Sequence, residues 1–213
     1  MAPGSAAGLS AGELRARLAS TRLAEHPDRV DLAVTTRDWR PGFRGRLRDE
    51  LSPAAVLIPI VDRSAELSVV LTRRSAKLAH HAGQVGFPGG RMESRDADLV
   101  ATALREAHEE LGIPPRRVEV VGYLSPVPTL SGYAVTSVVG LLLEGTPLTL
   151  EHTEVASAFE VPLGFLLDPA NQRRGTGDED RVAFPFEFRY GGRRIWGVTA
   201  SILIALREAL GDR

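Results

Sequence analysis

The chain has 213 residues, of which 43% are hydrophobic and 25% charged, a composition typical of one packed globular domain with or without an extension. Its 26 basic and 27 acidic residues leave a formal charge of −1, which provides no general positive field for nucleic acid or an anionic membrane. The absence of cysteine excludes disulfides, zinc thiolates and a cysteine nucleophile.

A helix and an irregular arm are predicted for the first 53 residues. Ser10 has the position of a helix N-cap, and Glu13 three residues later completes a capping box. Leucines then recur at helical spacing, so we expect a short amphipathic helix that ends near Pro27. Residues 28–53 are rich in Arg, Asp and Gly without a clear period. We expect them to wrap around a domain formed by residues 54–213.

Two apolar runs predict the first strands of a sheet. Residues 54–61 (AAVLIPIV) and 67–71 have strand length and are separated by a short polar turn, so the pair is expected to form a hairpin. Residues 76–91 are rich in glycine and predict loop or short strand. A strong helix is expected over 96–111, and Gly112 is its natural C-terminal stop.

The second half of the chain predicts further strands and one long helix. The expected segments are strand 118–124, loop 125–133, strand 134–143, a turn or short helix over 161–167, a mobile stretch over 173–180, strand 182–190 and helix 199–210. Pro185 interrupts strand 182–190. Mixed strands combined with two main helices indicate an α+β fold or an α/β/α sandwich.

Three glutamates cluster on the helix expected over 96–111. Apolar side chains three and four residues apart define its buried face: Val100, Ala103, Leu104, Ala107 and Leu111. The opposite face is assigned to Glu106, Glu109 and Glu110, where like charges four residues apart cost about 0.2–0.5 kcal/mol. A hard divalent cation, Mg²⁺ or Mn²⁺, would relieve this repulsion. The alternative is a solvated acidic face assisted by Arg105.

Gly90 and the run Arg105-Glu106-Ala107-His108-Glu109-Glu110-Leu111-Gly112-Ile113 form a specific pattern around this helix. Together they resemble the Nudix box, the signature of hydrolases that act on a nucleoside diphosphate linked to another group. The resemblance implies an α/β/α sandwich with a mixed β-sheet and a loop–helix–loop catalytic motif. Asp96 has the spacing from Gly90 that the general box gives an acid. Arg105 stands one position too far along, so one residue is inserted and the role of Asp96 is left open.

A second motif precedes the box. Leu71-Thr72-Arg73-Arg74-Ser75, Gly83 and Phe87-Pro88-Gly89-Gly90 resemble the motif of coenzyme A diphosphatases, a branch of the Nudix hydrolase family. Val70 replaces the first Leu of that motif. Ala79 replaces a later Arg, a candidate phosphate or adenosine contact. The resemblance implies hydrolysis of coenzyme A, or of an acyl thioester of it, to 3′,5′-ADP and (acyl-)phosphopantetheine.

The resemblance also implies roles for the acidic residues. The carboxylates of Glu106, Glu109 and Glu110 and the Gly90 carbonyl would bind Mg²⁺ or Mn²⁺, which would lower the pKa of a bound water. Glu106 or Glu109 would orient or deprotonate that water, and Arg105 would hold the glutamates in place. In other branches of the family a glutamate from a later loop serves as the base. The candidates for that role are Glu154, Glu160 and, more weakly, Glu151.

Several other residues are candidates for contact with the substrate. Cationic side chains that flank the glycine-rich segment are suited to phosphates: Arg73, Arg74, Lys77 and Arg91. A Pro- and Gly-containing loop offers polar groups to the pocket: Thr129, Ser131 and Tyr133. His80 and His81 are adjacent in a strand-like segment and would point opposite ways, so we assign them a structural role. Trp196 is assigned to the core rather than to an adenine platform.

Two other functions fit the same motifs. The chain is either another Nudix diphosphohydrolase, acting on ADP-ribose or NADH, or a ligand-binding regulator that kept the fold without catalysis. The expected partner is a small-molecule substrate, without nucleic acid or membrane, and a homodimer is one option for the assembly. No apolar run reaches ~18 residues and the first eight residues lack the pattern of a signal peptide, so we expect a cytoplasmic protein.

Overall fold

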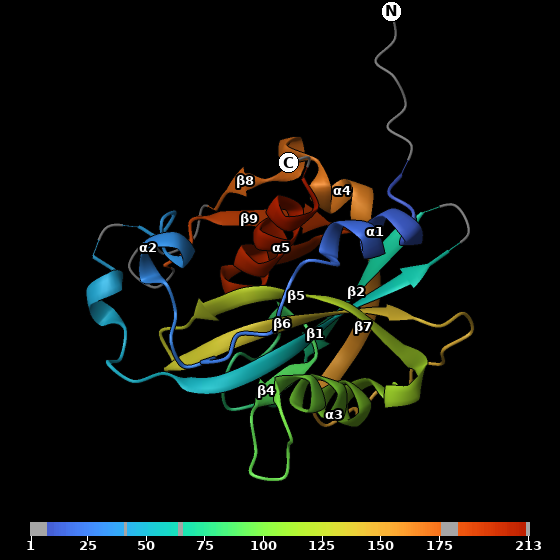
Figure 1. Cartoon of the computed structure of the whole chain (residues 1–213), viewed down its shortest axis with the longest axis horizontal. Helices are drawn as coiled ribbons and strands as arrows, with labels where there is room; N and C mark the ends of the chain where they lie inside the picture. The colour runs from blue at the N-terminus through green and yellow to red at the C-terminus, as the bar shows by residue number, and fades with distance from the viewer. Residues whose placement is uncertain (1–7, 41, 64–65, 176–182, 212–213) are drawn as a thin grey trace, which may run out of the picture.

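A computed structural model describes residues 8–40, 42–63, 66–175 and 183–211 (Figure 1). Its helices are α1 (Ala11–Leu18), α2 (Leu32–Thr35), α3 (Leu99–Leu111), α4 (Leu163–Leu167) and α5 (Gly197–Leu210). Its strands are β1 (Ser52–Asp62), β2 (Leu67–Arg74), β3 (Val85–Gly86), β4 (Gly89–Arg91), β5 (Val118–Pro128), β6 (Tyr133–Leu142), β7 (Val155–Pro162), β8 (Arg173–Arg174), β9 (Phe186–Tyr190) and β10 (Arg193–Trp196). None of the described helices is long and apolar enough to cross a membrane.

A mixed sheet with β1 at its centre organises the fold. The order β3-β2-β1-β6-β5 is hydrogen-bonded, while β4 adds to β1 and β7 adds to β2. β1 pairs parallel to β6 and antiparallel to β2 and β4. A second, smaller sheet has the order β10-β9-β8. The mixed sheet expected from the resemblance is therefore confirmed.

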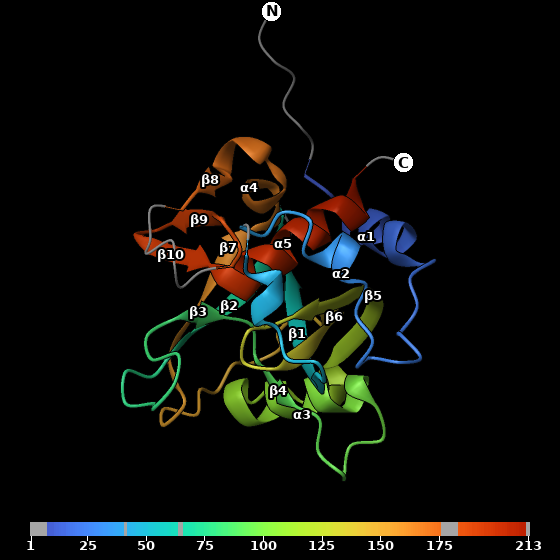
Figure 2. The same cartoon turned by 90° about the vertical axis from the view of Figure 1, so that its left-hand side faces the viewer.

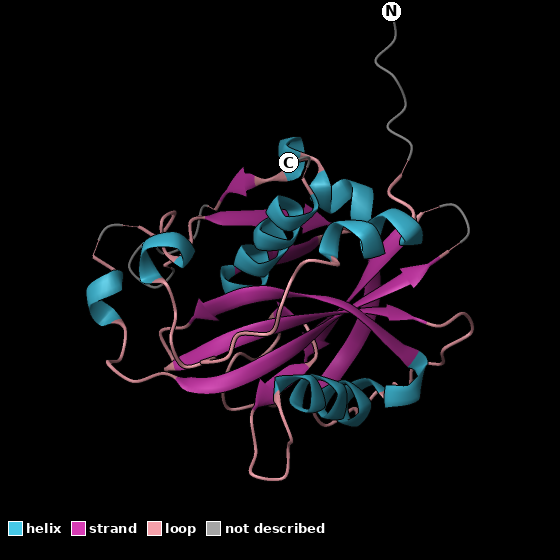
Figure 3. Ribbon diagram, in the orientation of Figure 1, coloured by secondary structure: helices cyan, strands magenta, loops and turns pink. Residues whose placement is uncertain are grey.

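Helices cover both faces of the large sheet. Figures 1 and 3 show α3 against one face and α1 and α5 against the other, which confirms the α/β/α sandwich. α3 buries Ala103 and Ala107 against Leu57 of β1 and Val138 of β6. Branched side chains that are buried on both faces are the reason that β1 reads as a continuous apolar run rather than an alternating one.

The N-terminal capping box forms as predicted, but the first helix is shorter than expected. Ser10 accepts a hydrogen bond from the Glu13 backbone N–H at 3.2 Å, and Glu13 accepts one from the Ser10 N–H at 2.9 Å. α1 ends at Leu18 rather than near Pro27. The cause is Thr21, whose hydroxyl donates to the Leu18 carbonyl at 2.7 Å and accepts from the Tyr123 N–H at 2.9 Å, so the chain turns onto β5.

Several strand boundaries differ from the prediction. The β1–β2 hairpin is confirmed, but β5 continues to Pro128 through the loop expected from residue 125, because its end pairs with β6. β7 and β10 were missed. β7 contains polar residues and pairs with β2, which lies far away in sequence. β10 has only four residues and pairs with the short strand β9. α3 begins at Leu99 instead of Asp96, because Asp98 is the N-cap.

The N-terminal arm is part of the packed structure. It contains α2, and it buries Thr36 and Phe43 to 1% and 5% exposure. β1 begins at Ser52, inside the segment assigned to the arm, and the division into two regions remains a prediction. Of the stretch 173–180 expected to be mobile, residues 173–174 form β8, and residues 176–182 lie outside the described residues, as does the expected start of strand 182–190.

Candidate active site

The ends of α3 are fixed by local contacts. The Asp98 carboxylate accepts a hydrogen bond from the Ala101 N–H at 2.8 Å, which satisfies one of the free donors in the first turn. Gly112 ends the helix in the left-handed conformation with φ of 64°, and a Cβ at this position would collide with Thr149. Both ends are therefore pinned, and the glutamates in the second half of the helix have defined positions.

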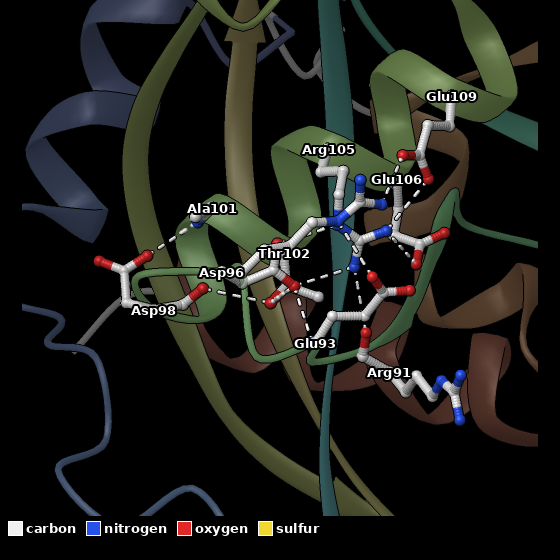
Figure 4. Close-up of polar contacts among 10 residues, drawn as sticks. Arg91, Glu93, Asp96, Asp98, Ala101, Thr102, Arg105, Glu106 and Glu109 are labelled. Atoms are coloured by element: carbon white, nitrogen blue, oxygen red, sulfur yellow. Dashed lines mark hydrogen bonds and ion pairs between the residues drawn. The ribbon is translucent and has the colours of Figure 1, made fainter.

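Arg105 is the centre of a polar cluster on α3 (Figure 4). Its guanidinium donates twice to the Asp96 carboxylate, both at 2.9 Å, and also to Glu106 at 2.8 Å and Glu109 at 3.0 Å. The Asp96 side chain is only 4% exposed and also accepts from the Thr102 hydroxyl. The hydrogen bonds from Arg105 hold the pKa of Asp96 well below its usual range, and the same pair raises the pKa of Arg105. Asp96 thus anchors Arg105.

Glu110 does not lie on the exposed face of α3, which corrects the assignment made from the sequence. It is 4% exposed, and successive 100° turns place it beside the buried residues Ala103 and Ala107. Burial raises the pKa of Glu110 to about 7, although the Gly89 N–H donates to it at 3.4 Å and Arg74 is close enough to oppose the rise. Burial also raises the pKa of Glu106, against the effect of Arg105, whereas the Glu109 side chain is 47% exposed.

The two glycines of β4 let the backbone reach these carboxylates. Gly90 pairs with Ala55 of β1, and a Cβ on Gly90 would collide with the Glu106 carboxylate. A Cβ on Gly89 would collide with the Ala55 carbonyl. Only glycine therefore permits this approach, as the double glycine in the sequence suggested.

The acidic residues fit a divalent cation in part. Within the described ranges, no three acidic or histidine side chains are gathered into a ready-made cation site. One reason is that Arg105 binds both Glu106 and Glu109. Glu106 and Glu110 remain a pair of largely buried carboxylates beside the glycine backbone. Burial raises the pKa of both, and the charge of Glu106 further raises the pKa of Glu110. Hard oxygen donors in such a position suit Mg²⁺ or Mn²⁺.

The three later glutamates differ in their distance from this cluster. Glu154 lies just before β7, and its charge raises the pKa of both Glu106 and Glu110, so it is a neighbour of the cluster. Glu160 is six residues farther, about 20 Å along an extended chain, and hydrogen-bonds to Arg63. Glu151 accepts from the Thr153 hydroxyl at 2.9 Å in an exposed turn. Glu154 is thus the later glutamate whose charge acts on the cluster, whereas the Glu151 backbone N–H donates to the Glu110 carbonyl at 3.0 Å.

A pocket of about 590 Å³ opens beside the glycines of β4. Five of the six residues assigned to substrate binding line it: Arg74, Arg91, Thr129, Ser131 and Tyr133. Arg73 does not, because adjacent residues of a strand face opposite sides, and it is exposed next to Gly83. Lys77 is exposed and also lies outside the lining. The volume is within the usual range for a small-molecule site, ~300–1,000 Å³.

Sequence reasoning missed the aromatic wall of this pocket. Trp39 from the arm, Phe184 and Trp196 all line it, so the assignment of Trp196 to the core was wrong. These residues come from opposite ends of the chain, and no local pattern signals their meeting. The histidine segment is a bend rather than strand-like, and His81 bonds Gln84 at 3.1 Å between Nδ1 and Oε1.

Comparison with known proteins identifies relatives of the chain. The family model of the NUDIX domain matches residues 51–176. The "Uncharacterized Nudix hydrolase NudL" of Citrobacter koseri is 46% identical over 165 residues, which cover 75% of this chain and 83% of that protein. The protein of the same name from Photorhabdus laumondii is 44% identical over 76% of this chain and 87% of its own. The crystal structure of a Nudix hydrolase from M. smegmatis, RenU, has the same fold, with a TM-score of 0.51 and 22% identity over 74% of this chain and 84% of that one.

Proposed function

Because this chain belongs to the Nudix hydrolase family, whose enzymes act on pyrophosphate-containing substrates, we propose that its substrate is coenzyme A or an acyl thioester of it. In this reaction the oxygen of water bonds to one phosphorus of the pyrophosphate, and the bond from that phosphorus to the bridging oxygen breaks. The products are 3′,5′-ADP and (acyl-)phosphopantetheine. The main support is the motif that runs from Leu71 to Gly90, because it supplies both Arg74 and Gly90 to one pocket.

The carboxylates of Glu106, Glu109 and Glu110 on α3, called here the acidic end, lie behind Gly90 of the pocket lining and are the proposed place for Mg²⁺ or Mn²⁺. Glu106, Glu110 and the Gly90 carbonyl would hold the cation, with Glu109 at the exposed rim. When bound, the cation supplies positive charge against the pyrophosphate and makes the attacking water more acidic. The chain contributes buried carboxylates at fixed positions, and a cation would offset the cost of burying Glu110.

Two roles are proposed around the carboxylates: one residue holds them in position, and one of the glutamates accepts the proton of the attacking water. Arg105 is a positioning residue: it holds Glu106 and Glu109 and is itself held by Asp96. Proton transfer from the attacking water is assigned to Glu106, Glu109 or Glu154. Glu154 is favoured among the later glutamates, because Glu160 is bonded to Arg63 on a distant part of β7.

The polar groups of the pocket are proposed to bind the phosphates and the ribose. The Arg74 Nε is buried and meets no hydrogen-bond acceptor in the described part of the chain, so its N–H is available to donate to an anionic ligand. The Thr129 hydroxyl lies 2.9 Å from the Ser131 hydroxyl and accepts from the Tyr133 N–H at 2.9 Å, which orients this loop before any ligand arrives. Ala79 is exposed and does not line the pocket, so the motif departure leaves the lining intact.

Two alternatives remain distinct hypotheses. ADP-ribose or NADH would use the same acidic end with different contacts in the aromatic part of the pocket. A regulator without catalysis would not need Glu106, Glu109 and Glu110, all of which are present. Their presence favours an active hydrolase.

The first experiment measures phosphopantetheine release from coenzyme A by the full chain with Mg²⁺ or Mn²⁺, and with EDTA as the control. ADP-ribose and NADH are assayed in parallel. We expect metal-dependent cleavage with the highest kcat/KM for coenzyme A or its acyl thioesters. A higher kcat/KM for ADP-ribose or NADH would overturn the coenzyme A assignment.

A matched pair of variants tests the later glutamate. Glu154→Gln is expected to lower kcat, whereas Glu160→Gln, from the same strand region, is expected to leave kcat unchanged. Equal kcat values for the two variants would remove Glu154 from the mechanism.

A further inference from the structure

The surroundings of Trp196 suit an aromatic ligand. The chain has two tryptophans, Trp39 and Trp196, and both line the pocket. The guanidinium carbon of Arg194 lies 5.0 Å from the centroid of the Trp196 ring. Trp196 lines the pocket and Arg194 does not, so a nucleobase in the pocket would meet the indole before the guanidinium. Bases stack on aromatic side chains of this kind.

One face of the small sheet carries positive charge next to Trp196. In antiparallel strands, directly opposed residues share a face, and alternate residues of one strand do so as well. The register pairs Arg173 with Glu187, Glu187 with Trp196, and Arg189 with Arg194. The residues that share this face, called here the arginine face, are Arg173, Glu187, Arg189, Arg194 and Trp196. The opposite face is the core face, where Phe188 and Ile195 are fully buried.

Glu187 orients the arginine face. Its side chain is 2% exposed, and it accepts hydrogen bonds from the Nε atoms of Arg189 and Arg194. These bonds use one edge of each guanidinium. Arg189 is 52% exposed and Arg173 is also exposed, so both remain accessible to a ligand. Among the described residues of this face, one carboxylate is opposed by three guanidiniums, so their summed charge is positive.

The arginine face is attached rigidly to the catalytic sheet. The Thr199 hydroxyl, at the start of α5 just after Trp196, donates to the Val85 carbonyl of β3 at 3.0 Å. β3 precedes the glycines of β4 by only a few residues, and Figure 2 shows β10, the strand that carries Trp196, beside β3. A ligand whose pyrophosphate lies at Gly90 can therefore extend through the pocket to Trp196 and onto the arginine face.

We propose that the arginine face binds a phosphate on the ribose of the substrate, while Trp196 stacks on the base. The planar guanidinium fork is suited to phosphate oxygens, and three such groups on the same face of the sheet as Trp196 match a dianion. If the substrate is coenzyme A, this phosphate is the 3′-phosphate; that identification rests on the proposed function. The arginine face then selects substrates that carry the additional phosphate.

Kinetics with a matched substrate pair test the proposal. Arg173→Ala is compared with Arg174→Ala, its neighbour on the opposite face of β8, for coenzyme A and 3′-dephospho-coenzyme A. We expect Arg173→Ala to raise KM for coenzyme A about tenfold, the effect of one lost charge-assisted contact, with kcat unchanged. KM for 3′-dephospho-coenzyme A and both constants of Arg174→Ala stay at wild-type values. An equal rise for the two substrates would overturn the proposal while the hydrolase activity stands.

Ligand binding separates this proposal from the proposed function. Trp39→Phe leaves Trp196 as the sole tryptophan, and its fluorescence is titrated with 3′,5′-ADP and with 5′-AMP without metal. We expect both nucleotides to quench it, 3′,5′-ADP with about tenfold higher affinity, and Arg173→Ala to abolish the difference. Equal affinities, or quenching only in Trp196→Phe, would overturn the proposal. If the wild type cleaves no coenzyme A, the proposed function fails. The titration still tests, independently, whether the arginine face binds the phosphate on the ribose.

Discussion

Two charged clusters, each next to a residue that lines the pocket, are built with opposite charges on the same plan: the acidic end, beside Gly90, and the arginine face, beside Trp196. At the acidic end one guanidinium, Arg105, lies among Asp96, Glu106 and Glu109. On the arginine face one carboxylate, Glu187, lies between Arg189 and Arg194. In both clusters the central charge is shielded from solvent and members of the surrounding set of opposite sign stay accessible.

In each cluster the central ion orients side chains of like charge without neutralising all of them. A buried central ion uses some of the hydrogen-bonding groups of each neighbouring side chain. The remaining lone pairs or N–H groups stay available to a ligand. At the acidic end the ligand is proposed to be a cation, and on the arginine face it is proposed to be a phosphate. Within the described part of the chain, Glu110 accepts its hydrogen bond from the neutral Gly89 N–H, at 3.4 Å, rather than from a central ion.

Removing Glu110 should break the acidic end with the largest effect on activity. Glu110→Gln is expected to lower kcat about 10³-fold, equivalent to ~4 kcal/mol, because it removes a buried negative charge proposed to bind the cation. The melting temperature is expected to stay the same or rise, because a buried carboxylate with a pKa raised to about 7 is costly. Steady-state kinetics with saturating Mn²⁺ and thermal unfolding check this. Turnover within threefold of wild type contradicts it.

Removing the central ion of the acidic end should have the largest effect on stability. Arg105→Met leaves the Asp96 carboxylate unpaired at 4% exposure, which is expected to lower the free energy of unfolding by about 3 kcal/mol. Urea unfolding at neutral pH measures this. The double variant Asp96→Asn/Arg105→Met should regain more than half of the loss, because the uncompensated charge is gone. If the double variant is no more stable than Arg105→Met, burial of Asp96 is not the cause.

Removing the central ion of the arginine face should give a smaller, pH-dependent loss. Burial raises the pKa of Glu187, but the hydrogen bonds from Arg189 and Arg194 outweigh burial and hold it below the ordinary 4.5. The folded state therefore binds fewer protons, so this stabilisation is full above about pH 4.5 and is lost as the pH falls through the folded pKa. Glu187→Gln should cost about 2 kcal/mol at pH 7.

The pH dependence provides the control for that variant. The difference in unfolding free energy between wild type and Glu187→Gln should shrink as the pH falls below 4.5, because the wild-type carboxylate becomes protonated. Urea unfolding at pH 7, 5 and 3.5 measures it. A difference that is constant over this range would mean that charge is not what Glu187 contributes.

Arg95 is an exposed arginine beside the acidic end, and it allows an ion at the edge of the cluster, called here peripheral, to be compared with the central ion Arg105. Arg95 also bonds Glu109, at 3.1 Å, but is 60% exposed. Arg95→Ala is expected to change the free energy of unfolding by less than about 0.5 kcal/mol, because water solvates both partners after the change. The same urea assay used for Arg105→Met measures this. A loss above 1 kcal/mol would show that peripheral ions contribute as much as central ones.

Local sequence signals predicted the capping box of α1 and the glycine that ends α3, because each depends on neighbours within a few residues. The double glycine of β4 was also predicted to allow a close approach, although its neighbours, Ala55 and Glu106, lie far away in sequence. The exposure of Glu110 was wrong for a physical reason. Glu110 is seven residues from Ala103, so successive turns place it about 20° from that buried residue on the helical wheel. Its charge, and not its position on the wheel, led to the prediction that it is exposed.

The aromatic lining of the pocket and the arginine face could not be predicted from the sequence, because both depend on tertiary contacts. Trp39 and Trp196 are 157 positions apart, and no local pattern in the sequence links them. The arginine face depends on the register of three short strands, one of which has only two residues. Such strands have too few residues to show alternation, so their pairing and the residues that share a face become visible only in the fold.

The parallel pairing at the middle of the sheet sets a condition on how the chain is synthesised. Every β1–β6 pair joins residues 81 positions apart, as Ser52 and Tyr133 are, and closing so large a loop costs entropy before the new contacts compensate. α3 lies inside that loop and packs on Leu57 from one side of it and Val138 from the other. On the ribosome the helix emerges before half of its support exists, and its buried glutamate reaches its final environment only after β6 has been made.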